Sequence, residues 1–183
     1  MRRLVAWNLM TLDGYFEGKT LWALDFHETV WGDELHDFSL EQGREAGTLL
    51  FGRRTYEGMA DYWTKATGDI ADMMNSIDKA VATRTLDEAT WNNTRLLKGD
   101  AVEAVRALKA EDRKDIFVFG SANLLDSLLT AGLVDEYRIC LAPVVLGGGN
   151  PLFKPRESEL RMRLESTRPL KTGGVVLTYR MNG

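Results

Sequence analysis

The sequence is poor in cysteine and histidine and contains no long hydrophobic run. Its single cysteine, Cys140, excludes an intrachain disulfide and, because it lies in an apolar run, indicates a core residue. The two histidines, His27 and His36, lack the spacing of metal ligands, and no serine or cysteine nucleophile motif occurs. No apolar stretch approaches the length of a membrane span. These shortages predict a protein with no metal centre and no membrane partner.

An excess of positive charge is also missing. The chain has 23 lysines and arginines against 27 aspartates and glutamates, and its formal net charge of -4 attracts neither nucleic acid nor an anionic membrane. Its first residues form a short strand-like run that meets Asn8 and Asp13 too early for a signal peptide. We therefore expect a cytoplasmic protein that does not bind nucleic acid. The length favours a single domain over residues 1–183.

What the chain does have is an alternation of short apolar runs and amphipathic segments. The apolar runs predict strands at residues 3–9, 49–51, 79–83, 95–97, 116–119 and 134–142. The segments between them predict helices at residues 34–46, 55–62, 69–76, 101–110 and 124–131. This order predicts an α/β fold with a mostly parallel sheet covered on both faces. Two final runs without a helix between them predict an antiparallel hairpin at one edge of the sheet.

Two loops have unusual compositions. Residues 15–33 are irregular and rich in aromatic side chains, and residues 143–155 are rich in glycine. A loop that carries large apolar rings usually covers a site or packs against a partner. Because two-fold association is the commonest form of oligomer, we expect these loops to contribute to a homodimer.

Four strand ends carry residues that suit a phosphate ligand. In open parallel sheets, ligands bind at the carboxyl ends of the strands, where helix N-termini offer unpaired N–H donors. The four ends are Asp13-Gly14, Gly52-Arg53-Arg54-Thr55, Thr83-Arg84 and Gly120-Ser121-Ala122-Asn123. Their glycines allow close approach and their arginines suit an additional phosphate, so together they predict a phosphorylated dinucleotide. The alternative for each is structural: a helix start, a solvated surface or, at Asp13, a plain turn.

The same segments, taken in order, resemble a known family. Gly52-Arg53-Arg54-Thr55-Tyr56-Glu57 resembles the Gly-Arg-x-Thr-Trp/Tyr-Glu segment of dihydrofolate reductases, and Val118-Phe119-Gly120-Ser121 resembles their second glycine motif. Val81-Ala82-Thr83-Arg84 resembles the strand end that meets the adenosine 2′-phosphate. Met10-Thr11-Leu12-Asp13-Gly14 and residues 133–149 resemble the reductase domain of riboflavin biosynthesis. The resemblance implies a dihydrofolate reductase-like three-layer sandwich that binds NADPH.

This resemblance also implies roles for individual residues. The expected cofactor-binding residues are Ala6, Asn8, Gly14, Gly52, Arg53, Arg54, Thr55, Thr83, Arg84, Gly120, Ser121, Ala122, Asn123 and Leu124, with Thr55 at a helix start. Leu146 and Gly147 are expected to border the substrate. Asp13 is the first candidate for the catalytic acid and Asp37 the second. The second glycine motif departs from the Gly-Gly of dihydrofolate reductases, because it reads Gly120-Ser121 here.

The expected function is NADPH-dependent reduction of a small heterocycle. By resemblance, the nearest activity is reduction of 5-amino-6-(5-phosphoribosylamino)uracil. The cofactor supplies the hydride and the protein supplies position and electrostatics. Reduction of a pterin or dihydrofolate is an alternative, although no acid clearly matches the group that contacts the pterin. A non-catalytic nucleotide-binding dimer module is a second alternative, because a fold alone does not define a function.

Overall fold

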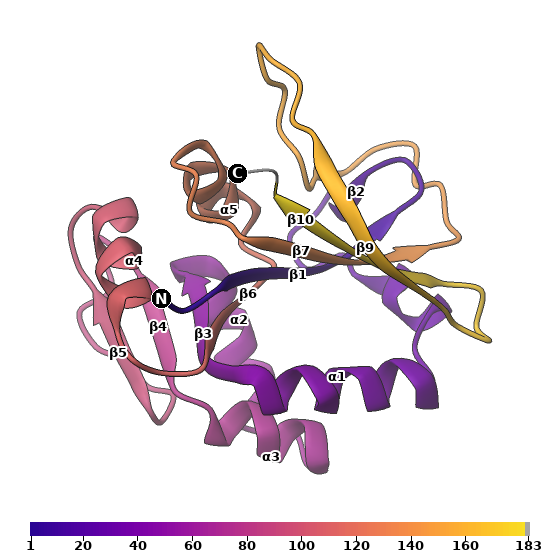
Figure 1. Ribbon diagram of the computed structural model, residues 1–183. Helices are drawn as coiled ribbons and strands as arrows, with labels where there is room; N and C mark the ends of the chain where they lie inside the picture. Colours follow the sequence, from indigo (N-terminus) through magenta and orange to yellow (C-terminus); the bar gives the residue numbers. More distant parts are fainter. Residues whose placement is uncertain (182–183) are drawn as a thin grey trace.

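A computed structural model describes residues 1–181, whose main feature is a twisted sheet with helices on both faces (Figure 1). The sheet contains β1 (Leu4–Thr11), β3 (Ala46–Gly52), β4 (Lys79–Ala82), β5 (Thr94–Leu97), β6 (Asp115–Phe119), β7 (Glu136–Ala142), β9 (Met162–Pro169) and β10 (Val175–Met181). The helices are α1 (Asp33–Glu45), α2 (Arg53–Trp63), α3 (Asp69–Ser76), α4 (Ala101–Ala110) and α5 (Ala122–Thr130), with a 3₁₀ turn η1 at Asp25–Thr29.

The strand order is β5-β4-β3-β6-β1-β7-β10-β9. The strands from β5 to β7 run parallel, whereas β10 pairs antiparallel with both β7 and β9. The predicted α/β class, the mostly parallel sheet and the antiparallel edge hairpin are therefore confirmed. Because β6 inserts between β3 and β1, the strand order reverses at these three strands.

Alternating side chains of β1 show how the two faces of the sheet are covered. Leu4 and Ala6 point into a core shared with α4 and α5, whereas Val5 joins a second core that includes Tyr56 and Met74. Trp7 belongs to a third cluster under α1 and η1, which also contains the buried Cys140. Side chains with a period of two thus give each layer of helices its own apolar contact.

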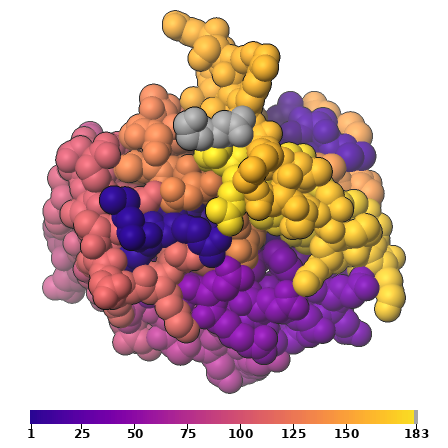
Figure 2. Space-filling model, viewed as in Figure 1, coloured from indigo at the N-terminus to yellow at the C-terminus, as the bar shows by residue number. Residues whose placement is uncertain are grey.

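A second, two-stranded sheet was not expected from the sequence. β2 (Tyr15–Glu17) pairs antiparallel with β8 (Asn150–Pro151) and so joins the aromatic loop to the glycine-rich loop. Both segments are too short for a periodic pattern to reveal them. Figure 2 shows that the chain between β8 and β9 projects from the body of the molecule.

Candidate active site

A cavity of about 460 Å³ opens at the carboxyl ends of three neighbouring strands. Asn8 of β1, Gly52 at the end of β3 and Phe119 at the end of β6 all line it. The cavity therefore lies where the strand order reverses, which is the usual ligand position in open α/β sheets. Its volume is typical of a small-molecule site.

Two helix N-termini meet at one end of this cavity. Helix α2 begins directly after Gly52 and helix α5 directly after Ser121, and no side chain caps either N-terminus. The first backbone N–H groups of each helix therefore have no intrahelical partner and stay available to a ligand. These groups, together with the positive ends of two helix dipoles, have the chemistry that suits an anion with more than one phosphate.

A serine hydroxyl joins these two N-termini. Ser121 Oγ accepts the backbone N–H of Gly52 at 3.1 Å and lies 3.3 Å from the Phe119 carbonyl oxygen, to which it donates. Gly120 and Ser121 both have left-handed backbone conformations, with φ of 59° and 56°. Such a conformation is strained for serine, and strain of this kind is frequent at ligand sites. At Gly120 it suits glycine, and an added Cβ there would lie 3.3 Å from the Thr55 methyl group.

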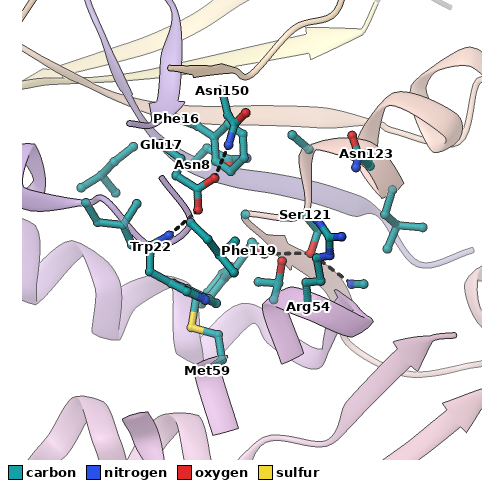
Figure 3. Close-up of a pocket in the computed structure, with 18 of the residues that line it drawn as sticks. Asn8, Phe16, Glu17, Trp22, Arg54, Met59, Phe119, Ser121, Asn123 and Asn150 are labelled. Carbon is teal, nitrogen blue, oxygen red and sulfur yellow. Dashed lines mark hydrogen bonds between the residues drawn. The ribbon is translucent and has the colours of Figure 1, made fainter. Parts of the chain in front are cut away.

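The arginines expected at the cofactor divide into two groups. Arg53 and Arg54 line the cavity, and Figure 3 shows Arg54 beside Ser121. Arg53 forms an ion pair with Glu57 at 3.1 Å, whereas Arg54 is exposed and has no ion pair among residues 1–181. Arg84 is exposed at the end of β4, the strand next to β3, and does not line the cavity.

Most other residues expected at the cofactor also lie at the cavity. Thr55 lines it, although α2 begins at Arg53, so Thr55 is the third residue of the helix rather than its start. The remaining members of this group are Asn8, Gly52, Gly120, Ser121, Ala122, Asn123 and Leu124. The structure does not bring Ala6, which is fully buried, or Gly14 to the cavity wall. Thr83 is also absent from the wall, and its hydroxyl accepts the N–H groups of Thr85 and Leu86.

The two expected catalytic acids lie away from the cavity wall. The carboxylate of Asp13 accepts the Thr11 hydroxyl at 2.7 Å and the backbone N–H groups of Leu146 and Gly147 at 3.2 and 2.8 Å. The Thr11 bond, followed by the backbone bonds, lowers the pKa of Asp13. Leu146 and Gly147 consequently bind Asp13 and do not line the cavity. Asp37 lies on the exposed side of α1 beside His36.

Sequence reasoning missed the polar groups at the opposite end of the cavity. Glu17 of β2 is buried, with 6 % exposure, and lines the cavity beside Trp22 and Asn150 (Figure 3). One carboxylate oxygen accepts the Trp22 backbone N–H at 2.7 Å, and the other accepts the Asn150 side-chain amide. These residues come from the two loops whose compositions were noted, but no local pattern reveals that the loops pair.

Two buried nitrogens at the cavity have no hydrogen-bond partner among residues 1–181. They are Nδ2 of Asn8, a residue only 4 % exposed, and Nε2 of His27. Burial lowers the pKa of His27 to about 4, so its imidazole is neutral at pH 7. Since buried polar atoms normally have partners, these two nitrogens are candidates for contact with a bound molecule.

Neither metal binding nor membrane insertion has structural support in the described part of the chain. Residues 1–181 contain no group of three or more His, Cys, Asp or Glu side chains arranged to hold a metal ion. Within the same residues, no helix combines the length and apolarity required to cross a bilayer. The polar groups at the cavity include backbone N–H, amide and guanidinium donors and one buried carboxylate acceptor.

The fold and the position of the cavity define an α/β protein of the dihydrofolate reductase type. The solved structure of dihydrofolate reductase from Enterococcus faecalis, complexed with NADP(H) and RAB-propyl, matches with a TM-score of 0.65 at 17% identity, over 99% of this chain and 97% of that one. A putative riboflavin biosynthesis protein from Shewanella sp. PV-4 matches with a TM-score of 0.81 at 22% identity, over 99% of both chains.

The chain belongs to the RibD C-terminal domain family, whose sequence profile matches residues 2–176. The uncharacterized protein YyaP of Bacillus subtilis (strain 168) is 30% identical over 190 residues, which cover 100% of this chain and 96% of that protein. The predicted membership of the riboflavin-type reductase domain family is therefore confirmed, and the solved structures confirm the dihydrofolate reductase-like fold.

Proposed function

We propose that the protein is an NADPH-dependent reductase of a small heterocyclic compound. The observation that carries this proposal is the meeting of two uncapped helix N-termini in one cavity, held together by Ser121 and Gly52. Their unpaired N–H groups suit the two phosphates of a dinucleotide. The NADP(H) bound by the Enterococcus faecalis dihydrofolate reductase and the motif resemblance support the same cofactor.

The donors of this chain fit NADPH at the phosphate end of the cavity. Gly52, Ser121 and the first turns of α2 and α5 would hold the pyrophosphate, with the exposed cation of Arg54 beside it. We propose that Arg84, exposed at the end of β4, meets the 2′-phosphate. The bound cofactor supplies a hydride, and this chain supplies orientation and exclusion of water. Asp13 acts as a positioning residue that holds the 146–147 loop.

The leading substrate is 5-amino-6-(5-phosphoribosylamino)uracil, because the family of the chain and its motifs both point to the riboflavin pathway. Reduction of a pterin is the first alternative, and turnover of the phosphoribosyl pyrimidine compared with dihydrofolate separates the two. A nucleotide-binding module without catalysis is the second alternative. It predicts binding of NADPH with no oxidation by either substrate.

The experiment that tests the cofactor is titration of the purified protein with NADPH and, separately, with NADH, followed by nicotinamide fluorescence. Stoichiometric binding of NADPH that is at least roughly tenfold tighter than binding of NADH is expected, since a guanidinium–phosphate contact contributes at least about 1.4 kcal/mol. Failure of both nucleotides to bind at millimolar concentration would refute the reductase proposal.

We further propose that the functional protein is a cytoplasmic homodimer. Leu12 and Val145 are 57% and 70% exposed, and the backbone bond from Leu12 to Val144 places their segments together. Exposed apolar side chains that adjoin in this way favour contact with a second copy. The mass in solution at micromolar concentration tests this proposal, and a monomeric mass would refute it.

A further inference from the structure

The largest fully buried side chain within residues 1–181 belongs to a loop. It is the indole of Trp91, which is 2 % exposed and lies in the 83–93 loop between β4 and β5. Loops usually run over the surface and bury few large side chains, and a buried indole needs a partner for its N–H. The burial of Trp91 therefore indicates that this loop is fixed to the body of the protein.

Trp91 is attached to the segment that leads into α2. Its indole stacks on Phe51, with ring centroids 6.0 Å apart and planes at 28°, and its backbone N–H donates to the buried Tyr56 hydroxyl at 2.9 Å. Phe51 directly precedes Gly52, and Tyr56 is the fourth residue of α2. The contacts of Trp91 thus lie on both sides of the helix N-terminus proposed to hold the pyrophosphate.

The remaining polar contacts of Trp91 lead to α3 and β4. Its indole N–H donates to Asn75 Oδ1 at 2.7 Å, and Lys79 Nζ lies 4.5 Å from the ring centroid. Lys79 also donates to the backbone carbonyl of Asn92 at 3.2 Å. Within residues 1–181, the bond from Trp91 to Tyr56 is consequently the only hydrogen bond between the 83–93 loop and α2.

The opposite end of the same loop carries Arg84. A hydrogen-bonded turn at Thr83 presents this exposed guanidinium group. Leu86 and Ala89, which follow it, pack against the apolar cluster that contains Trp91. Because packed side chains are continuous from Trp91 to the turn, a shift of Trp91 changes the position from which Arg84 acts.

We propose that Tyr56 is a positioning residue for the selectivity between NADPH and NADH. Through Trp91 it holds Arg84 at the distance from the N-terminus of α2 that matches a ligand with both a pyrophosphate and a 2′-phosphate. Neither Tyr56 nor Trp91 lines the cavity, so the effect is one of preorganisation. This inference rests on the proposed function, because it takes Arg84 and the start of α2 as contacts of one cofactor.

Tyr56→Phe tests the inference, because it removes the hydroxyl that accepts the Trp91 N–H and retains the ring. In titrations followed by nicotinamide fluorescence, this variant should bind NADPH roughly three- to tenfold more weakly, while the Kd of NADH should stay within about twofold. Tyr62→Phe is the matched control, since it makes the same change on the same helix at a side chain that is 62% exposed. It should leave both affinities unchanged.

A double-mutant cycle with Arg84→Gln separates positioning from a purely structural role. In the Arg84→Gln background, Tyr56→Phe should cause no further loss of selectivity, because the cation that Tyr56 positions is gone. Hydrogen exchange without nucleotide gives a second readout. The amides of residues 84–90 should exchange faster in Tyr56→Phe than in the wild type or in Tyr62→Phe.

The possible results distinguish this inference from the proposed function. If the wild type prefers NADPH but Tyr56→Phe retains the full preference, or loses affinity for both nucleotides equally, the inference is overturned and the reductase proposal stands. Unchanged exchange over residues 84–90 in Tyr56→Phe, or an equal loss of selectivity with and without Arg84, would overturn it as well. If the wild type binds neither nucleotide, the reductase proposal is refuted and the inference falls with it.

Discussion

The hydroxyl oxygen of Ser121 lies 3.1 Å from the backbone nitrogen of Gly52 and accepts its N–H. This bond spans 69 positions in the sequence and connects the residues that precede α2 and α5. It therefore fixes the relative position of two helix N-termini, whose unpaired N–H groups form the proposed phosphate site. The serine that departs from the Gly-Gly pattern of dihydrofolate reductases thus has a defined structural role.

Two replacements of Ser121 distinguish the effect of losing this hydrogen bond from the effect of relieving the backbone strain. Ser121→Ala should lower the free energy of unfolding by about 1 kcal/mol, because the bond is lost. Ser121→Gly loses the same bond but relieves the left-handed conformation, so its stability should stay near that of the wild type. Both variants should bind NADPH roughly three- to tenfold more weakly, as measured by nicotinamide fluorescence and denaturant unfolding. Unchanged NADPH affinity in both would contradict the role of the bond.

The two exposed arginines Arg54 and Arg84 should affect the binding of nicotinamide nucleotides differently. Arg84→Gln should weaken NADPH roughly tenfold and leave NADH unchanged, since the 2′-phosphate is present only in NADPH. Arg54→Gln should weaken both nucleotides to a similar degree, because the pyrophosphate is common to them. Parallel titrations of the two variants with NADPH and NADH measure these changes in affinity. A loss of selectivity in Arg54→Gln, with none in Arg84→Gln, would exchange the two assignments.

The two histidines should give pH dependences of opposite sign. The pKa of His27 falls from 6.5 to about 4 in the folded state because the ring is buried. The unfolded chain therefore binds more protons between these values, and stability should decrease as the pH falls from 6.5 to 4. His27→Gln should remove this decrease in urea unfolding measured across the range.

His36 provides the internal comparison for this effect. Its hydrogen bonds to Asp69, at 2.9 Å, and to Asp37 raise its pKa. Its stabilising contribution is therefore complete below pH 6.5 and is lost as the pH rises through the raised value. His36→Gln should consequently remove the gain in stability that accompanies a fall in pH from the raised value to 6.5, and should leave the slope between pH 6.5 and 4 unchanged. A decrease that persists in His27→Gln would show that other groups cause it.

Gln42 on α1 should lower the free energy of unfolding of the wild-type protein. It is 1 % exposed, and neither its amide nitrogen nor its amide oxygen has a hydrogen-bond partner among the described residues. Gln42→Met retains the length of the side chain and removes the two polar atoms, so the free energy of unfolding should rise by about 1–2 kcal/mol. Gln42→Glu should lower it. A less stable methionine variant would indicate that the amide is hydrogen-bonded in solution.

The parts of the site that the sequence predicted belong to regular elements. Gly52 and Gly120 each follow an apolar strand, so the rule that ligands bind at carboxyl strand ends located them. The start of α2 was placed two residues late, because Thr55 resembles an N-cap whereas Gly52 provides no side-chain cap. Asp13 was identified as a functional residue, but its contacts with Leu146 and Gly147 depend on tertiary structure.

The rules for strand ends and helix caps could not have identified Glu17 as a cavity residue. Its strand has three residues, and the Asn150 amide that binds it is 133 positions away. Neither residue belongs to a periodic pattern, and a glutamate in a loop is normally solvated. Its burial results from the pairing of β2 with β8, which is a property of the whole fold.

The same long-range pairing distinguishes the two ends of the cavity by the length of chain that each contact spans, 69 positions between Gly52 and Ser121 and 133 between Glu17 and Asn150. The phosphate end is built from residues 52–55 and 120–124. The opposite end, which contains Glu17 and Asn150, needs both β2 and β8. Contacts between residues distant in sequence are formed late, because closing a long loop is entropically unfavourable. During refolding, the chain should therefore acquire affinity for nucleotide before it can discriminate between ring compounds. The appearance of this discrimination would then indicate that β2 and β8 have paired.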